Sequence, residues 1–337
     1  MQKRIALWDN LKLFIIALVV IGHLAMQYFY TSEIFGTFIM ITYTFTMPAF
    51  VFISGLFSKH SINSDKPPVK KAMCFIVLSF FIKVLNYIAN IIFGVHVSFE
   101  IFYVKDIPWY MLAMGLWYLI TWALRKTDEK YILICSVVLG CFAGYMQGNT
   151  DFLCILRFIT FYPFFYSGYI LQRESVENFT AKKSIKIFSA IFLVIYVITF
   201  IVHFEDLSVF RPLITARGKY EELGEFYDWG CLIRLAYYVL NMLIITALIA
   251  LCPRKEFMIS KYGSRTLQIY IYHRPIIYIM KNAGLFYLIQ QAVGDGWEWI
   301  GILLMLVLTA LLCPKFWSKP IDYLLNPKEK KEYAAAK

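Results

Sequence analysis

The chain alternates between apolar runs of about twenty residues and short polar connections, and about twenty residues is the length a helix needs to cross a bilayer. Ten such runs cover residues 11–30, 36–57, 72–94, 108–124, 131–147, 154–172, 186–203, 230–251, 264–281 and 298–314. Helices satisfy their own backbone hydrogen bonds in lipid. The pattern therefore predicts an all-α, polytopic membrane protein with about ten transmembrane helices in one domain, residues 1–325. A charged cytoplasmic tail, 326–337, is expected to follow.

The charged residues predict how the chain crosses the membrane. Of the 33 lysines and arginines, 24 fall on one side when the connections are assigned alternately and five on the other. Basic residues concentrate on the cytoplasmic side of membrane proteins. Both termini are therefore expected in the cytoplasm, and this distribution explains the formal charge of +11 without a nucleic-acid partner.

The first apolar run carries a polar stripe. Lys12 and His23 lie eleven residues apart, almost three helical turns, so their side chains share one face about 16 Å apart along the axis. Asp9 lies one turn before Lys12 on the same side. Lipid cannot satisfy such groups, so the stripe is expected to face protein or water.

Further ionisable residues lie inside or at the ends of the other runs. Lys83 begins a second polar stripe that continues with two asparagines, and His273 and Arg274 stand together just before a proline. Arg157 has no obvious acidic residue nearby in the sequence, so it needs a partner from another helix or an anionic ligand. Arg234 lies in the outer half of the eighth run. Charged groups at membrane depth are costly and commonly mark sites.

The longest outer connection, about residues 204–229, is rich in acidic residues and has no clear hydrophobic period. Long loops of this kind are usually functional or mobile. The segment either covers an outward-facing acceptor site or forms a solvated surface loop.

Several other chemistries find no support in the sequence. The seven cysteines show no CxxC or metal-ligand spacing and are interpreted as small core residues. There is no P-loop, dinucleotide fingerprint, metal-binding histidine pair or GxSxG elbow. We predict no metal. A histidine can instead remove a proton from an alcohol that attacks a thioester, while cations hold the phosphates of coenzyme A.

Two early segments resemble a known family. Residues 8–12 with 20–23 (WDNLK and VIGH) and residues 45–48 with 52–55 (FTMP and FISG) resemble the membrane-bound acyltransferase-3 superfamily, closest to the branch named for fucose 4-O-acetylase. Residues in the sixth and ninth runs match later blocks, among them Phe161, Pro163, Gly168, Gly263, Thr266 and His273. The resemblance implies ten transmembrane helices, cytosolic acetyl-CoA as donor, and a hydroxyl of a cell-surface or exported glycan as acceptor.

Carried onto this chain, the resemblance makes His23 the catalytic histidine and Lys12 the residue that positions the donor. The wider family commonly has arginine where this chain has Lys12. The one-turn spacing adds Asp9 as the partner of Lys12. Lys83 and Arg274 are further candidates for binding the donor, and Arg157, His273 and Arg234 for binding the acceptor or lining a cavity.

The resulting hypothesis is an O-acetyltransferase of the cell membrane, most simply a bacterial plasma membrane. His23 acts as general base, or carries the acetyl group itself as an acetyl-histidine. The partners expected are a glycan or glycolipid acceptor and membrane lipid, and a homodimer is left open. The competing hypothesis is a transporter or flippase of an anionic glycolipid, and a structural subunit would leave the polar stripes unexplained.

Overall fold

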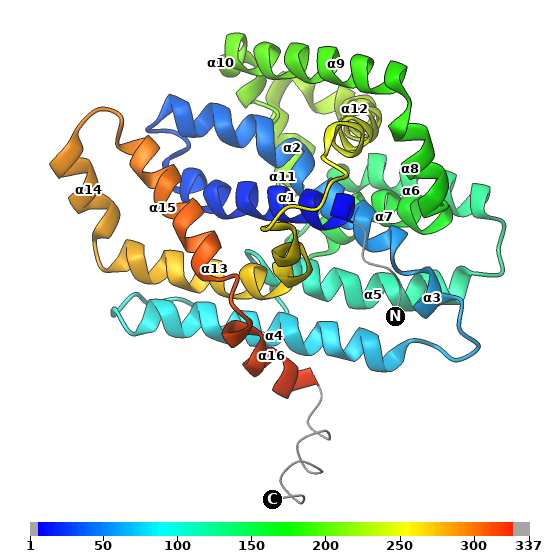
Figure 1. Cartoon of the computed structure of the whole chain (residues 1–337), viewed down its shortest axis with the longest axis horizontal. Coiled ribbons are helices and arrows are strands. Elements are labelled where there is room, and N and C mark those ends of the chain that lie inside the picture. Colours follow the sequence, from blue (N-terminus) through cyan, green and yellow to red (C-terminus); the bar gives the residue numbers. More distant parts are fainter. Residues whose placement is uncertain (1–5, 326–337) are drawn as a thin grey trace, which may run out of the picture. The chain divides into compact units, whose positions relative to one another are not determined.

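The computed structural model describes residues 6–325, which fold into helices joined by short connections (Figure 1). This part of the chain contains no β-strand, only an isolated antiparallel bridge between Tyr103 and Phe152. The all-α prediction is confirmed for these residues. The predicted tail, 326–337, lies outside them.

The described residues group into two compact units, and the prediction of a single domain stays a prediction. The terminal unit consists of residues 6–24, 84–97 and 253–325, and the central unit of residues 25–83 and 98–252. The helices of the terminal unit are α1 (Ala6–Ala25), η4 (Ser260–Arg265), α13 (Thr266–Asn282), α14 (Leu285–Val293), α15 (Trp297–Leu311), η5 (Lys315–Trp317) and α16 (Ser318–Leu325). It also holds the last two turns of α4 (Val69–Ile91).

The central unit holds the rest of α4 and all the remaining helices of the described residues. These are η1 (Met26–Tyr28), α2 (Glu33–Leu56), α3 (Lys59–Ile62), α5 (Pro108–Leu124), α6 (Glu129–Phe142), η2 (Ala143–Tyr145) and α7 (Ile155–Ile170). They continue with α8 (Arg173–Ala181), α9 (Lys183–Val202), α10 (Phe204–Ser208), α11 (Arg211–Thr215), η3 (Tyr220–Trp229) and α12 (Gly230–Leu251).

Glycines allow α2 and α7 to pack backbone to backbone inside the central unit. A Cβ at Gly55 would lie 1.9 Å from the carbonyl oxygen of Phe165, and a Cβ at Gly168 would lie 2.1 Å from that of Phe52. Membrane helices pack by such close approach because lipid offers no hydrophobic drive for association. The small residues therefore hold this helix pair together.

Ten helices coincide with the ten predicted runs, but they differ in length. Five are long and apolar enough to cross a membrane, within Ala6–Tyr28, Glu33–Leu56, Val69–Ile91, Lys183–Val202 and Tyr220–Leu251. A sixth span is formed if α15 and the segment Lys315–Leu325, bent by 71°, count as one. The other four helices, α5, α6, α7 and α13, have only 17, 14, 16 and 17 residues. The structure thus gives five or six spans, and the count of ten stays a prediction.

The surface of α9 supports a lipid environment. Its side chains are apolar around most of the helix and mostly exposed, including Phe188, Ile191, Ile195 and Ile198. A helix that is hydrophobic all round is buried in protein or in lipid. Because protein leaves most of the α9 surface exposed, we infer that lipid surrounds this surface.

Candidate active site in the terminal unit

The predicted pair at the start of α1 is formed. The Lys12 ammonium lies 3.0 Å from a carboxylate oxygen of Asp9, and the Asp9 side chain is almost buried while that of Lys12 is 26% exposed. The i,i+3 spacing brings the two groups together on one face. Lys12 therefore presents a partly exposed cation that Asp9 holds in place.

The next residue, Asn10, docks α1 against the segment that precedes α13. Its amide nitrogen donates to the carbonyl of Pro253 at 2.9 Å, and its amide oxygen accepts from the Ser260 hydroxyl at 2.5 Å. Gly263 allows the closest approach, since a Cβ there would lie 2.0 Å from the carbonyl oxygen of Asp9. These contacts fix the position of the ion pair within the unit.

At the other end of α1, His23 meets residues of α13. The imidazole rings of His23 and His273 have centroids 5.0 Å apart, inclined by 41°. Arg274 donates through Nη1 to the backbone carbonyl of His23 at 3.1 Å and through Nη2 to the Tyr278 hydroxyl at 3.1 Å. That carbonyl belongs to the last turn of α1, where carbonyls lack helical partners and the dipole favours a cation. Arg274 thus caps α1 and places positive charge beside the histidine pair.

The tautomer of His273 follows from its backbone contact. Its Nδ1 lies 2.9 Å from the carbonyl oxygen of Ile269, one turn earlier, and the side chain is fully buried. A carbonyl oxygen only accepts, so Nδ1 carries the hydrogen of this bond. In the neutral ring the basic lone pair then belongs to Nε2.

Together these residues give α1 two chemically different ends. The helix is continuous from Ala6 to Ala25, so the rise per residue places Lys12 and His23 about 16 Å apart along the axis. One end offers a cation that can bind phosphate, and the other offers an imidazole able to take and return a proton. The structure brings His23 beside His273 and Arg274, a contact between α1 and α13 that the sequence did not suggest.

The second predicted stripe also reaches α13. The amide nitrogen of Asn282 lies 3.2 Å from the side-chain oxygen of Asn90, whose own amide nitrogen donates to the carbonyl of Asn86 at 2.8 Å. Asn90 and Asn282 therefore bind each other within the terminal unit. They join two helix ends and offer no group that titrates.

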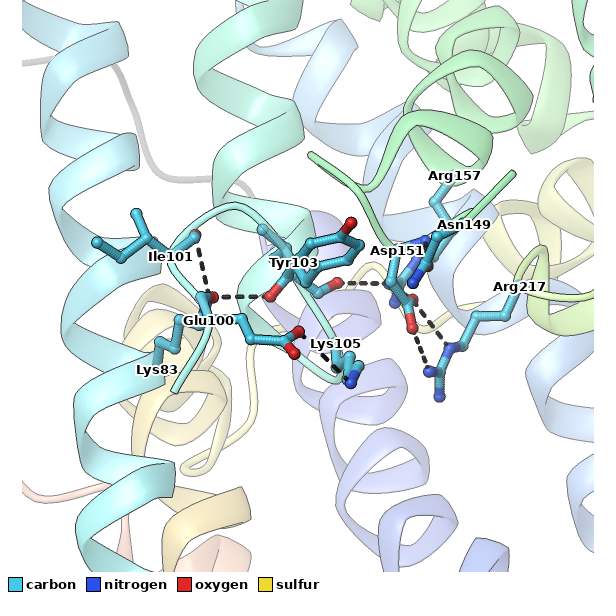
Figure 2. A network of polar contacts seen from close by, with 10 residues as sticks. Lys83, Glu100, Ile101, Tyr103, Lys105, Asn149, Asp151, Arg157 and Arg217 are labelled. Carbon is cyan, nitrogen blue, oxygen red and sulfur yellow. Dashed lines mark hydrogen bonds and ion pairs between the residues drawn. The ribbon is translucent and has the colours of Figure 1, made fainter. Parts of the chain in front are cut away.

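Arg157 has a different environment, in the central unit. It donates through Nη2 to the carboxylate of Asp151 at 2.9 Å and to the carbonyl of Val104 at 2.7 Å. Arg217 pairs with the same carboxylate at 2.7 Å, as Figure 2 shows. The expectation that Arg157 lacks a local acid was wrong. Asp151 lies only six residues earlier, but in a loop, where helical spacing says nothing about contacts.

Lys83 also binds protein groups of its own unit. Its ammonium donates to the backbone carbonyls of Ile101 at 3.0 Å and Tyr103 at 2.9 Å, and also to that of Glu100 (Figure 2). Three acceptors match the three donors of an ammonium group. In this structure Lys83 anchors the loop that precedes α5, and its proposed part in donor binding stays a prediction.

The long connection before α12 is folded and not simply a solvated loop. It contains α10, α11 and η3, and its residues Leu213, Ile214 and Tyr220 are buried. The carbonyl of Leu213 accepts a hydrogen bond of 2.7 Å from Arg234, which is fully buried in α12. The segment therefore covers this arginine.

Other groups of chemical interest are few in the described part of the chain. All seven cysteines are free, and three of them, Cys141, Cys154 and Cys313, are buried. Residues 6–325 contain no cluster of three or more His, Cys, Asp or Glu side chains that could hold a metal ion. The absence of a metal from the reaction stays a prediction.

The helices that are long and apolar enough to cross a membrane place the protein in the class of multi-pass helical membrane proteins. The family model of the acyltransferase-3 family, described as an acyltransferase domain, matches residues 5–314. The chain belongs to this family, and membership indicates a membrane acyltransferase. No curated protein and no solved structure matches the chain significantly.

Sequence reasoning missed two positioning residues, Asn10 and Asp151. Asn10 lies in the segment 8–12 that resembles the family, but the sequence suggested no role for its side chain. Its hydrogen-bond partners lie more than 240 residues away. Asp151 was hidden because the chain between it and Arg157 reverses at Leu153 and Cys154, which have φ of 48° and 50°. No signal in the sequence predicts this reversal, because leucine and cysteine rarely adopt positive φ.

Proposed function

We propose that the protein is an O-acetyltransferase that moves an acetyl group from cytosolic acetyl-CoA to a hydroxyl of a cell-surface or exported glycan. We place it in a bacterial plasma membrane with both termini in the cytoplasm, in the branch named for fucose 4-O-acetylase. Membership of the acyltransferase family and the pairing of His23 with His273 beside Arg274 support this proposal.

The pairing of His23 with His273 is the observation that carries the chemistry. His23 removes the proton from the acceptor hydroxyl as its oxygen attacks the thioester carbonyl. When the tetrahedral intermediate collapses, the carbon–sulfur bond breaks, coenzyme A leaves as a thiolate and His23 returns the proton to it. The cationic Arg274 stabilises the negative charge that develops on the carbonyl oxygen. The products are the acetyl ester and free coenzyme A.

The ion pair at the start of α1 is assigned to the donor. Lys12 binds a phosphate of acetyl-CoA, and Asp9, 3.0 Å away, keeps the ammonium in position until the phosphate arrives. A lysine contacts phosphate as a point charge, whereas arginine would offer two parallel donors. Loss of Lys12 should therefore raise the KM for acetyl-CoA more than it lowers kcat.

Glycan analysis tests the function as a whole. Cells that produce the protein should carry one acetyl ester that is missing from cells without it, and membranes should incorporate label from radiolabelled acetyl-CoA into the same glycan. The purified protein should also be stabilised by acetyl-CoA, because a ligand that binds only the folded state raises its stability. A flippase would show neither incorporation nor stabilisation by the donor, and that pair of results would overturn the proposal.

A further inference from the structure

The central unit contains a buried arginine without a counter-ion. Arg234 is fully buried in α12 and makes one hydrogen bond, from Nη1 to the carbonyl of Leu213 at 2.7 Å. The rings of Tyr220 and Tyr237 flank its guanidinium, with centroids 5.9 and 5.3 Å away. No carboxylate in the described part of the chain forms an ion pair with it.

Arg157 shows what a balanced buried arginine looks like in the same unit. It is also buried, its guanidinium lies 5.3 Å from the ring centroid of Trp109, and it forms an ion pair with Asp151 at 2.9 Å. Removing a charge from water is costly unless a partner compensates for the lost hydration. The cation–π contacts of Arg234 supply part of that compensation, but a full opposite charge is missing.

The nitrogens that lack partners in Arg234 are Nε and Nη2. In a guanidinium these two atoms lie on one edge and point their N–H bonds in parallel. Parallel donors match the two oxygens of a carboxylate or a phosphate ester and bind them in a bidentate manner. The unused edge of Arg234 is therefore shaped for one oxyanion.

We propose that Arg234 is an oxyanion-binding site, which takes a carboxylate or phosphate ester through Nε and Nη2. This oxyanion site does not depend on whether the protein is an acetyltransferase. An acidic sugar and the headgroup of an anionic lipid both carry such a group, and the two sources are separated by experiment.

Tyr220 is one of the residues that cover this site, and its ring centroid lies 5.9 Å from the guanidinium. Its ring is 1% exposed, and its hydroxyl donates to the carbonyl of Cys141 at 2.8 Å. Two glycines make room for the ring, since a Cβ would lie 2.4 Å from it at Gly144 and 2.3 Å from it at Gly230. Tyr220 comes from η3, within the connection that precedes α12. The connection thereby contributes Tyr220 to the groups that cover the guanidinium, beside Tyr237 of α12.

Thermal unfolding of the full-length protein tests the site. The probes are glucuronate, with glucose as its neutral control, in detergent, and phosphatidylglycerol, with phosphatidylcholine as control, in nanodiscs. At saturation an oxyanion should raise the melting temperature by about 3 °C or more. A shift with glucuronate identifies an acidic sugar as the ligand, whereas a shift with phosphatidylglycerol alone identifies a lipid headgroup.

The variant R234M should abolish whichever shift the wild type shows and should unfold at no lower temperature than the wild type without probe, because an uncompensated charge has been removed. R157M is the matched control, and it should unfold at a lower temperature yet keep its response to the probe. Equal responses in R234M and wild type, or no response of the wild type to either anion, would overturn the proposal.

Two further variants test the site if R234M does not accumulate. R234K keeps the charge but loses the parallel donors, so its affinity for the responding probe should fall about tenfold. Y220A removes the cover and should raise that affinity. Unchanged affinity in both variants would contradict the assignment.

Discussion

The cluster between α1 and α13 and the network around Asp151 both bury charge, but they use it differently. In the Asp151 network each charge meets an opposite charge or a carbonyl, and no group is left to take part in chemistry. In the α1–α13 cluster two imidazoles lie 5.0 Å apart beside an arginine that binds a carbonyl and a phenol. Mutual neutralisation thus marks a structural site, and adjacent titratable groups mark a reactive one.

Loss of His23 should produce the largest effect. His23→Ala should lower acetyl transfer by about 10²–10⁴-fold, the usual contribution of a general base, and should change the melting temperature little. The measurement is incorporation of radiolabelled acetyl by membranes with matched protein levels. His96→Ala, which alters an exposed histidine, is the control and should keep full activity.

Loss of Asp151 should affect stability most. Asp151→Ala leaves Arg157 buried without its counter-ion, which should cost about 3–5 kcal/mol of unfolding free energy. Unfolding of the purified protein measures this, with Asp206→Ala as an exposed control. An unchanged stability would show that the network is not a structural core. Per folded molecule, acetyl transfer should remain.

A methyl group at Gly263 should disturb the way α1 is docked. Gly263→Ala places a Cβ where only 2.0 Å separates it from the carbonyl oxygen of Asp9, so the backbones must move apart. We expect a loss of about 1–3 kcal/mol in stability, together with a higher KM for acetyl-CoA as Lys12 shifts. If Gly263→Ala kept the wild-type KM for acetyl-CoA, the contact between Gly263 and α1 would not be needed to position the donor site.

The smallest effect is expected for Lys83. Lys83→Met loses the bonds to three loop carbonyls, but these groups are partly exposed to solvent, so stability should fall by only about 1 kcal/mol. Lys105→Met, in the same loop, is the matched control with a largely exposed side chain. If Lys83→Met instead raised the KM for acetyl-CoA without a change in stability, Lys83 would belong to the donor site.

Much of the fold could be predicted from apolar runs, because helix formation in lipid depends on local sequence. Each predicted run contains a helix, whereas the number of spans depends on length, and α6 has only 14 residues. The contact between Asp9 and Lys12 was predictable because both lie on one helix. The contact between His23 and His273 was not, because 250 residues separate them and spacing gives no information across such a distance.

The most direct test of the account compares His23→Ala with Asp151→Ala in one assay. Both variants are reconstituted in proteoliposomes, and acetyl transfer from radiolabelled acetyl-CoA is measured per mole of folded protein. We expect His23→Ala to lose at least about 10²-fold in acetyl transfer, while Asp151→Ala stays close to wild type. Wild-type activity in His23→Ala would contradict it.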